Sequence, residues 1–206
     1  MDPLNELRDT EMIRAHYGEP SHLAKAKQLD RLDQHCRAFI ELSPFVVIAT
    51  TDANGRTDAS PRGDAPGFVA VTDDRTLLVP DRTGNKRVDT MLNVATTGSV
   101  GLLFMVPGIN ETLRVNGSAR VIVEPAVLTQ LAANGKLPKS ALVITVEEVF
   151  FQCGKALIRS DLWNPNRHVA RENFPSLATI LADQIQGANA EEYETRIKEQ
   201  YRIGLY

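Results

Sequence analysis

Several features that mark common protein classes are scarce in this sequence. Its 206 residues hold two cysteines, Cys36 and Cys153, which lie too far apart to suggest a disulfide framework or a metal-binding motif. The four histidines show no metal-ligand spacing, so we expect no metal site. Lys and Arg number 23 against 26 Asp and Glu, and the resulting net charge of −3 argues against broad nucleic-acid binding, which needs a basic excess.

Long hydrophobic runs are missing as well. The longest apolar stretches, such as residues 45–49 and 100–106, are much shorter than the roughly 20 residues that cross a bilayer. The first residues have neither the basic region nor the apolar region of a signal peptide. Because isolated cysteines also suit a reducing compartment, we expect a cytoplasmic protein with no membrane partner.

The residues that are present suit one domain with a substantial core. Hydrophobic residues make up 43% of the chain, as in ordinary soluble globular proteins. We expect a helical segment over residues 1–44, a β-rich core over 45–163 and a helical extension over 164–206. In the first segment Ser21 can cap a helix that Pro44 ends, and its apolar stripe comprises Leu23, Ala26, Leu29, Leu32, Cys36, Phe39 and Ile40.

Short runs rich in Val, Ile and Thr, separated by turn residues, predict the strands of the core. They cover residues 45–51, 56–61, 68–72, 76–80, 99–106, 111–123 and 141–151. Asn54-Gly55 is a strong hairpin signal between the first two strands. Short helices are expected at 85–93, with Val88, Met91 and Leu92 on one face, at 125–133, and from about residue 173 onward. This pattern predicts a mainly β fold, a small antiparallel Greek-key-like barrel with flanking helices.

The first candidate site is the basic turn Arg82-Thr83-Gly84-Asn85-Lys86-Arg87, which follows an apolar strand and opens a predicted helix. A helix start offers free N–H groups and a positive end, and Lys or Arg adds full charge, so this turn can bind an anion. The pattern is neither a Walker A loop nor a dinucleotide fingerprint. A solvated basic turn without a ligand is the alternative interpretation.

The second candidate is Ser60-Pro61-Arg62-Gly63-Asp64, which lies between two predicted strands. Arg62 can hold a phosphate through two parallel hydrogen bonds. Asp64 can instead pair with Arg62, and in that case the cluster is purely structural.

The third candidate lies in residues 111–117. Thr112 and Arg114 share one face of the predicted strand, while Leu113 and Val115 take the other. The polar face would suit the edge of a cofactor. A water-exposed face of an edge strand is the alternative.

The fourth candidate lies in residues 153–163. Lys155 and Arg159 are four residues apart, so on a helical turn they share a face, where an anion would relieve their repulsion. Trp163, the only tryptophan, can stack on a flat ring or fill the core. For Cys153 we expect a buried, inert thiol.

Together these clusters resemble the pyridoxamine 5′-phosphate oxidase family of FMN-binding split barrels, in particular its branch of FMN-dependent enzymes of unassigned substrate. The resemblance runs from about residue 45 to residue 163. It is best over residues 78–121, where a strand, an Asp-Arg-x-Gly-Asn-Lys-Arg turn, a short helix, a Val-Gly-Leu-Leu-Phe strand, a Pro-Gly turn and Leu-Arg-Val-Asn-Gly follow in order. This order makes the match more specific than any single part.

The resemblance implies FMN as the cofactor. The implied FMN-binding residues are Arg62, Gly63, Asp64, Asp81, Arg82, Asn85, Lys86, Arg87, Thr112, Arg114, Lys155, Arg159 and Trp163. Among them Arg62, Lys86 and Arg87 would hold the phosphate, and Asp81 and Arg82 would lie along the ribityl chain or the ring.

The resemblance also implies a homodimer. Thr112 falls where the oxidases have a Gln near the flavin ring, and Arg114 lies two residues further on. Family members build the site across the subunit interface, so residues 153–163 would approach FMN from the second subunit.

This sequence differs from the pyridoxamine 5′-phosphate oxidases themselves, and the differences limit which of their properties the resemblance implies. Their long basic strand is replaced here by residues 60–64, and a helix rich in Glu and Gln replaces their substrate motif at the end of the chain. The resemblance therefore implies an FMN-dependent oxidoreductase acting on an unidentified small molecule rather than vitamin B6 oxidation. The alternative is a flavin-binding or flavin-sensing module without turnover. A haem-binding barrel would need a histidine to ligate iron, and no predicted strand contains one.

Overall fold

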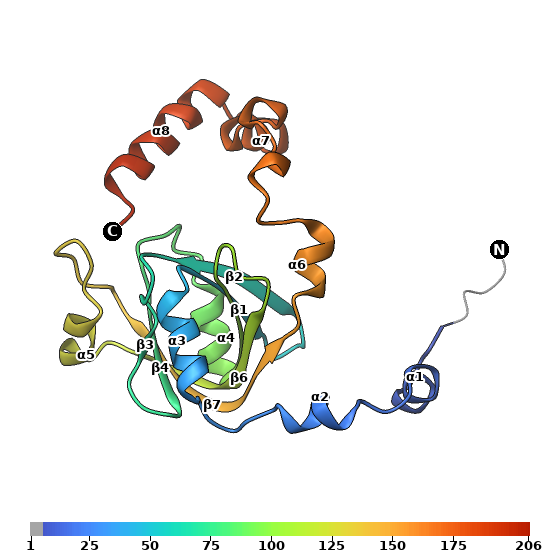
Figure 1. Cartoon of the computed structure of the whole chain (residues 1–206). Helices are drawn as coiled ribbons and strands as arrows, with labels where there is room; N and C mark the ends of the chain where they lie inside the picture. The colour runs from blue at the N-terminus through green and yellow to red at the C-terminus, as the bar shows by residue number, and fades with distance from the viewer. Residues whose placement is uncertain (1–5) are drawn as a thin grey trace.

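The computed structural model describes residues 6–206 as one antiparallel sheet with helices around it (Figure 1). The strands are β1 (Phe45–Thr51), β2 (Thr57–Gly63), β3 (Ala70–Val71), β4 (Thr76–Pro80), β5 (Ser99–Met105), β6 (Thr112–Ile122) and β7 (Ala141–Gln152). The helices are α1 (Thr10–Tyr17), α2 (His22–Ala26), α3 (Gln34–Leu42), α4 (Asp89–Thr97), α5 (Pro125–Gln130), α6 (Lys155–Ser160), α7 (Leu177–Gln184) and α8 (Ala190–Ile203), with 3-10 turns at Pro165–Arg167 and Arg171–Asn173. The predicted mainly β fold with flanking helices is confirmed.

The strand order is β2-β1-β5-β6-β7-β4-β3, and every neighbouring pair is antiparallel. β1 and β2 form the predicted hairpin, in which Thr51 pairs with Thr57 and Gly55 has a φ of 79° that favours glycine. β2 is an edge strand, which suits Pro61 because proline cannot donate to a ladder. Within residues 6–206 no ladder joins the two edges of the sheet, so closure into a barrel stays a prediction.

The main core fills one face of the sheet. Val46 and Ile48 of β1 are fully buried on this inner face, while Val47 and Ala49 alternate onto the outer face. Helices α3 and α4 pack on the inner face and add Ile40 and Val94 among others to the same cluster. Beneath α5 a smaller second cluster covers β4 and β7; its members are Leu78, Leu128, Leu131, Ala141 and Val143.

A bulge bends the longest ladder of the sheet. The pairing of β6 with β7 shifts between Asn116 and Gly117. A Cβ atom at Gly117 would lie 1.9 Å from the Thr145 carbonyl oxygen, so only glycine fits there. The bend helps to wrap the sheet around its core.

The prediction of one continuous helix before Pro44 is wrong. The chain forms three short helices, and Leu29, which the apolar stripe had placed on a helix face, instead makes a reciprocal backbone bridge to Val149 of β7. Ser21 does cap a helix, since its hydroxyl accepts from Ala24 N, but that helix is only α2. A second cap, Asp33, accepts from Cys36 N and starts α3. Pairing with β7 outweighs the helical pattern of the sequence.

The other boundary differences are small, except at the basic turn. The hairpin strand continues to Gly63, the predicted strand over 68–72 is only the short β3, and the predicted helix over 125–133 ends at Gln130. The helix predicted at 85–93 is instead α4, which begins at Asp89. Its predicted apolar face is wrong, because Val88 and Leu92 are exposed while Thr90 and Val94 are buried.

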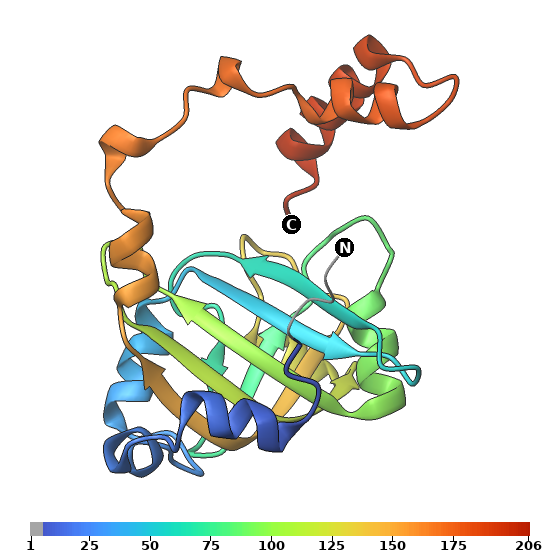
Figure 2. The same cartoon turned by 90° about the vertical axis from the view of Figure 1, so that its right-hand side faces the viewer.

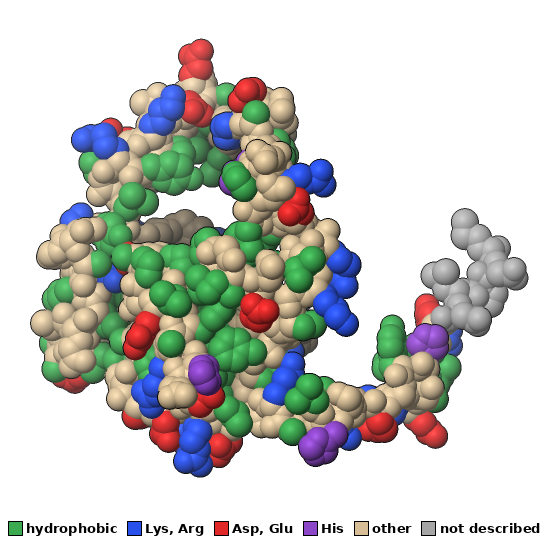
Figure 3. All heavy atoms as spheres, in the orientation of Figure 1, with side chains coloured by type: hydrophobic (Ala, Val, Ile, Leu, Met, Phe, Trp, Pro, Cys, Tyr) green, Lys and Arg blue, Asp and Glu red, His purple; other side chains and the backbone are tan. Residues whose placement is uncertain are grey.

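Helices α1 and α2 extend away from the sheet (Figure 1), and α7 and α8 stand apart from it at the other end of the chain (Figure 2). Helices α1 and α2 bury no residue. Helices α7 and α8 pack on each other at the end of an extended stretch that follows α6. We call residues 161–203 the C-terminal arm. Hydrophobic side chains lie on the side of this arm that faces the sheet (Figure 3).

Candidate functional site

A groove of about 640 Å³ opens between β2 and the loop that joins β4 to α4. It is lined by residues 58 and 60–63 of β2, by residues 80–88 and by the first residues of α4, together with Phe68, Lys139 and Leu205. The volume is within the range of small-molecule sites, roughly 300–1,000 Å³. β2 is one edge of the sheet and β4 is next to the other edge, so the fold brings distant strands to one site.

The loop that borders the groove has an unusual backbone. Lys86 and Val88 have positive φ values of 64° and 55°, a region that side chains rarely adopt. Val88 is the N-cap of α4, and no side chain caps the helix there. The first N–H groups of α4 therefore lack intrahelical partners and a side-chain cap, next to a groove that Thr90 and Met91 help to line. These two left-handed residues also explain why the helix starts later than predicted.

Arg62 lies on the inner face of β2, because it pairs directly with the buried Val46. Its guanidinium donates to the Pro61 carbonyl over 2.9 Å and to Thr90 Oγ1 over 3.4 Å. Thr90 is 1% exposed, and its hydroxyl in turn donates to Asp58 Oδ2. The side chain of Arg62 is thus held at the start of α4 by neutral groups.

The alternative that Asp64 pairs with Arg62 is wrong. Asp64 instead pairs with Arg82, whose Nε lies 2.7 Å from Asp64 Oδ2, and both side chains are largely buried. Arg82 Nη1 also donates to the Leu131 carbonyl over 2.7 Å. Burial alone would raise the pKa of Asp64, but hydrogen bonds from Tyr206, Ala65 and Arg82 outweigh it and lower that pKa.

The remaining cations of the groove differ in how they are neutralised. Arg87 pairs with Asp89 over 2.8 Å, and Asn85 Oδ1 accepts from its backbone N–H. Arg62, Lys86 and Lys139 form no ion pair within residues 6–206. Three such cations beside a free helix start make the groove suitable for an anion.

Asp81 is an acidic group in the same groove. Burial raises its pKa, although the positive charges of Arg62 and Lys139 act to lower it. When it is ionised, the Asp81 carboxylate offsets part of the positive charge of the groove. An anion bound nearby would raise the pKa of Asp81 further, because it would favour the protonated form.

Thr112 and Arg114 lie elsewhere, on the outer face of the sheet. Arg114 pairs with Leu103 and Phe150 across the ladders, and its guanidinium lies over the Phe150 ring. Thr112 Oγ1 donates to Gln152 Oε1 over 3.2 Å. The predicted division of faces is confirmed, because Leu113 and Val115 are fully buried. A shallow cavity of about 320 Å³ there is lined by Val47, Ala49, Gly101, Leu102, Leu103, Arg114, Asn116 and Gln152.

The fourth cluster forms α6 and the turn after it. Lys155 and Arg159 lie on this exposed helix. Trp163 is partly buried, and its Nε1 donates to the Ile109 carbonyl over 2.9 Å, which ties the end of α6 to the β5–β6 connection. Cys153 is exposed, so the expectation of a buried thiol is wrong. Strand β7 ends at Gln152, one residue before Cys153, and the chain leaves the sheet there.

A single chain therefore does not gather all the predicted residues. Arg62, Gly63, Asp81, Arg82, Asn85, Lys86 and Arg87 line the groove, and Asp64 lies against it. Thr112, Arg114 and the α6 cluster lie on other surfaces. Among residues 6–206 no group of three or more His, Cys, Asp or Glu side chains is placed to hold a metal ion. In the same range no helix is long and apolar enough to span a membrane.

Comparison with known proteins identifies the family. The model of the pyridoxamine 5′-phosphate oxidase family matches residues 32–153, more than half of the chain. The chain belongs to this family. No curated protein matches the chain in sequence.

The solved structures that are similar to this family member have low sequence identity to it. HupZ of group A Streptococcus is 22% identical, with a TM-score of 0.50 over 58% of this chain and 93% of that chain. A protein from Clostridium acetobutylicum related to general stress protein 26 is 16% identical, with a TM-score of 0.45 over 57% and 85%. An FAD binding protein from Mycobacterium smegmatis is 17% identical, with a TM-score of 0.42 over 60% and 97%. At these identities only the HupZ likeness supports the fold, and none indicates a function.

Some groove residues of this oxidase-family chain were not predicted. Lys139 precedes β7 and reaches the groove from a part of the sequence without any basic cluster. Thr90 lies within the predicted helix, where nothing in the pattern marks it as a partner of Arg62. Leu205 lines the groove from beyond α8. Lys139 and Leu205 come from separate segments, so no local motif could have indicated them.

Proposed function

We propose that this chain binds FMN in the groove and acts as a flavin-dependent oxidoreductase on a small molecule. The observation that carries the proposal is the meeting of Arg62, Lys86 and Lys139, none of them in an ion pair within residues 6–206, with the uncapped start of α4. Like charges in one groove repel each other, and a doubly charged phosphate would relieve this repulsion. Membership of the pyridoxamine 5′-phosphate oxidase family supports the same ligand class.

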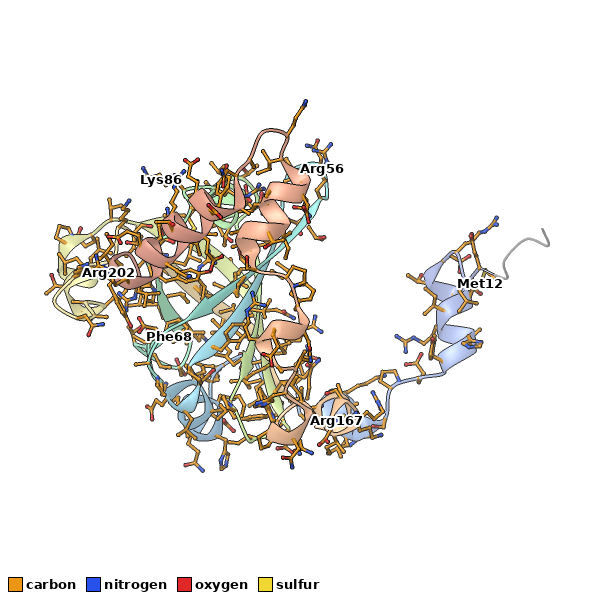
Figure 4. The ribbon with its side chains drawn as sticks, turned by 90° about the horizontal axis from the view of Figure 1, so that it is seen from above. Met12, Arg56, Phe68, Lys86, Arg167 and Arg202 are labelled. Carbon is orange, nitrogen blue, oxygen red and sulfur yellow. The ribbon has the colours of Figure 1, made fainter. Side chains whose placement is uncertain are left out.

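The residues present fit the phosphate end of FMN. Arg62 is already oriented toward the start of α4 by Thr90, so little side-chain entropy would be lost on binding. Lys86 lies on the loop that borders the groove and is exposed (Figure 4). The N–H groups at the start of α4 add further donors, and the Asp89 carboxylate in the same turn is paired with Arg87. Together they select for a terminal phosphate.

In this proposal, residues from a second copy of the chain help to bind the ring end of FMN. Thr112 and Arg114 lie on the outer face of the sheet, whereas Arg62 lies on the inner face of β2. A homodimer that packs through the outer faces of β1, β5 and β6 would present these residues, and those of α6, to the groove of its partner. Lys155, Arg159 and Trp163 are the α6-region residues that we propose for this contact.

The flavin would supply the redox chemistry, and the protein would position it and control access. The groove also contains Asp81, a carboxyl group whose pKa is raised by burial. The substrate is an unidentified small molecule. A flavin-binding module without turnover is the alternative.

The deciding experiment is an absorption spectrum of the purified protein before and after FMN is added. Bands of bound oxidised flavin, with FMN as the cofactor released on denaturation, would support the binding proposal. A colourless protein that takes up no FMN would refute it. Reduction of the bound flavin by NADH or NADPH, followed by reoxidation with a defined acceptor, would separate an oxidoreductase from a module that only binds.

A further inference from the structure

A short segment after α8, residues 204–206, returns to the groove. The Tyr206 hydroxyl donates to Asp64 Oδ1 over 2.7 Å, and the Tyr206 backbone oxygen accepts from Lys136 Nζ over 2.8 Å. The Tyr206 ring lies 5.8 Å from the Arg82 guanidinium carbon. This segment lies outside residues 32–153, which the family model matches.

The contact is made to a fixed acceptor. Asp64 Oδ2 receives Arg82, while Oδ1 receives both the Ala65 N–H and the Tyr206 hydroxyl. The Asp64 side chain is 4% exposed. Arg82 and Ala65 hold the Asp64 carboxylate in place. The Tyr206 hydroxyl therefore binds where these two partners leave the carboxylate open.

Leu205 is carried into the groove by this contact. It lines the groove and is nevertheless 61% exposed, next to a lining that is otherwise rich in charge. An exposed apolar side chain at that place gains free energy when a ligand with an apolar surface covers it. Seen from above, α8 with Arg202 lies on the same side of the molecule as Lys86 (Figure 4).

The C-terminal arm is attached to the rest of the structure at its two ends. Trp163 holds its beginning and Tyr206 lies beyond its end, while α7 and α8 pack mainly on each other between them. Loss of the hydrogen bond from the Tyr206 hydroxyl would therefore loosen residues 204–206, which keep the Lys136 contact, without disturbing the sheet.

We propose that residues 204–206 form one wall of the ligand site, in which Leu205 contacts the bound ligand and Tyr206 is the positioning residue. The proposal rests on FMN binding in the groove and names a part of the site that lies outside the residues matched by the family model. A ligand bound against this wall gains the contact with Leu205 and loses it only on dissociation. The wall therefore slows release more than it slows entry.

The test is the rate of FMN dissociation measured by stopped-flow fluorescence for four full-length proteins. These are the unchanged protein, Tyr206→Phe, Leu205→Ala and the control Tyr201→Phe, which removes a hydroxyl from an exposed tyrosine of α8. Loss of one hydrogen bond to a charged acceptor predicts dissociation about tenfold faster for Tyr206→Phe, with little change in association. Leu205→Ala should speed dissociation several-fold, and the control should not differ from the unchanged protein.

Hydrogen–deuterium exchange of the peptide that contains residues 204–206 gives a readout apart from the cofactor. Tyr206→Phe should raise exchange there in the ligand-free protein, and FMN should lower it in the unchanged protein. Equal dissociation rates in all four proteins would overturn the wall while leaving FMN binding in place. If the unchanged protein takes up no FMN, the proposed function itself fails and the wall has no ligand.

Discussion

Arg82 Nε lies 2.7 Å from Asp64 Oδ2, in a pair whose side chains are only 16% and 4% exposed. Asp64 follows β2 and Arg82 follows β4, so this pair joins two strands that lie far apart in the sheet order. It lies where the groove, the Leu131 carbonyl and Tyr206 meet. Because the pair both joins these strands and borders the groove, breaking it should affect the ligand site as well as the stability of the fold.

We expect Asp64→Asn to lower the free energy of unfolding by about 3 kcal/mol, because it leaves the largely buried Arg82 without a counter-charge. Urea unfolding followed by circular dichroism would measure this. The matched control is Asp89→Asn, which breaks the exposed pair with Arg87 and should cost less than about 1 kcal/mol. Equal losses in the two variants would contradict a structural role for the Asp64–Arg82 pair.

Combined Arg62→Ala and Lys86→Ala should abolish FMN retention while the fold persists. Each charged contact to phosphate contributes about 1.5–3 kcal/mol, so affinity should fall by roughly two to four orders of magnitude if the effects add. Fluorescence titration with FMN is the measurement. Arg14→Ala with Lys25→Ala removes the same charge from the exposed N-terminal helices and should bind FMN normally. Unchanged affinity in the groove variant would refute the phosphate site.

Asp81→Asn should raise stability and FMN affinity near neutral pH. Burial raises the pKa of Asp81, so its ionised form is disfavoured in the folded protein, and this cost is present once the pH exceeds that pKa. The stability gained by the variant should vanish at about pH 3, where Asp81 is protonated in both folded and unfolded chains. Thermal melts across this pH range would test the sign.

Asp73 provides a control of opposite sign for that experiment. Hydrogen bonds, first of all the one from the Arg75 N–H, lower the pKa of Asp73, so its ionised form stabilises the fold above its ordinary pKa. Asp73→Asn should therefore lose stability near neutral pH, and the loss should disappear in acid. The same pH profile in both variants would argue against the role given to burial at Asp81.

Leu103→Glu tests the proposed dimer. Leu103 lies on the outer face of β5 and lines the shallow cavity there, so the charge should not enter the core. We expect the variant to run as a folded monomer in analytical ultracentrifugation and to lose most FMN affinity, because Thr112 and α6 of a second copy would be missing. Leu92→Glu, at an exposed position of α4, is the control. A Leu103→Glu dimer with normal FMN binding would refute the outer-face interface.

The sequence by itself determined most of the sheet. Alternation in residues 45–51 and 111–123, the Asn54-Gly55 turn and the apolar run at 99–106 are local signals, and the structure has strands at each of these places. The order of these parts also indicated the family that the family model confirms. The basic turn at residues 82–87 and the cluster at 60–64 that contains Arg62 could be recognised as anion-binding candidates, because each is short and contiguous in the sequence.

Tertiary structure decided which charges remain available. Arg62 and Arg82 look alike in the sequence, yet Arg82 forms an ion pair with Asp64, while Arg62 donates hydrogen bonds only to neutral groups among residues 6–206. Lys139 and Leu205 reach the groove from distant segments, and the bridge from Leu29 to Val149 interrupts a helical pattern. The physical reason is common to all of these. Local propensity acts over a few neighbouring residues, whereas ion pairs, ladder hydrogen bonds and groove walls depend on which distant segments the folded sheet brings together.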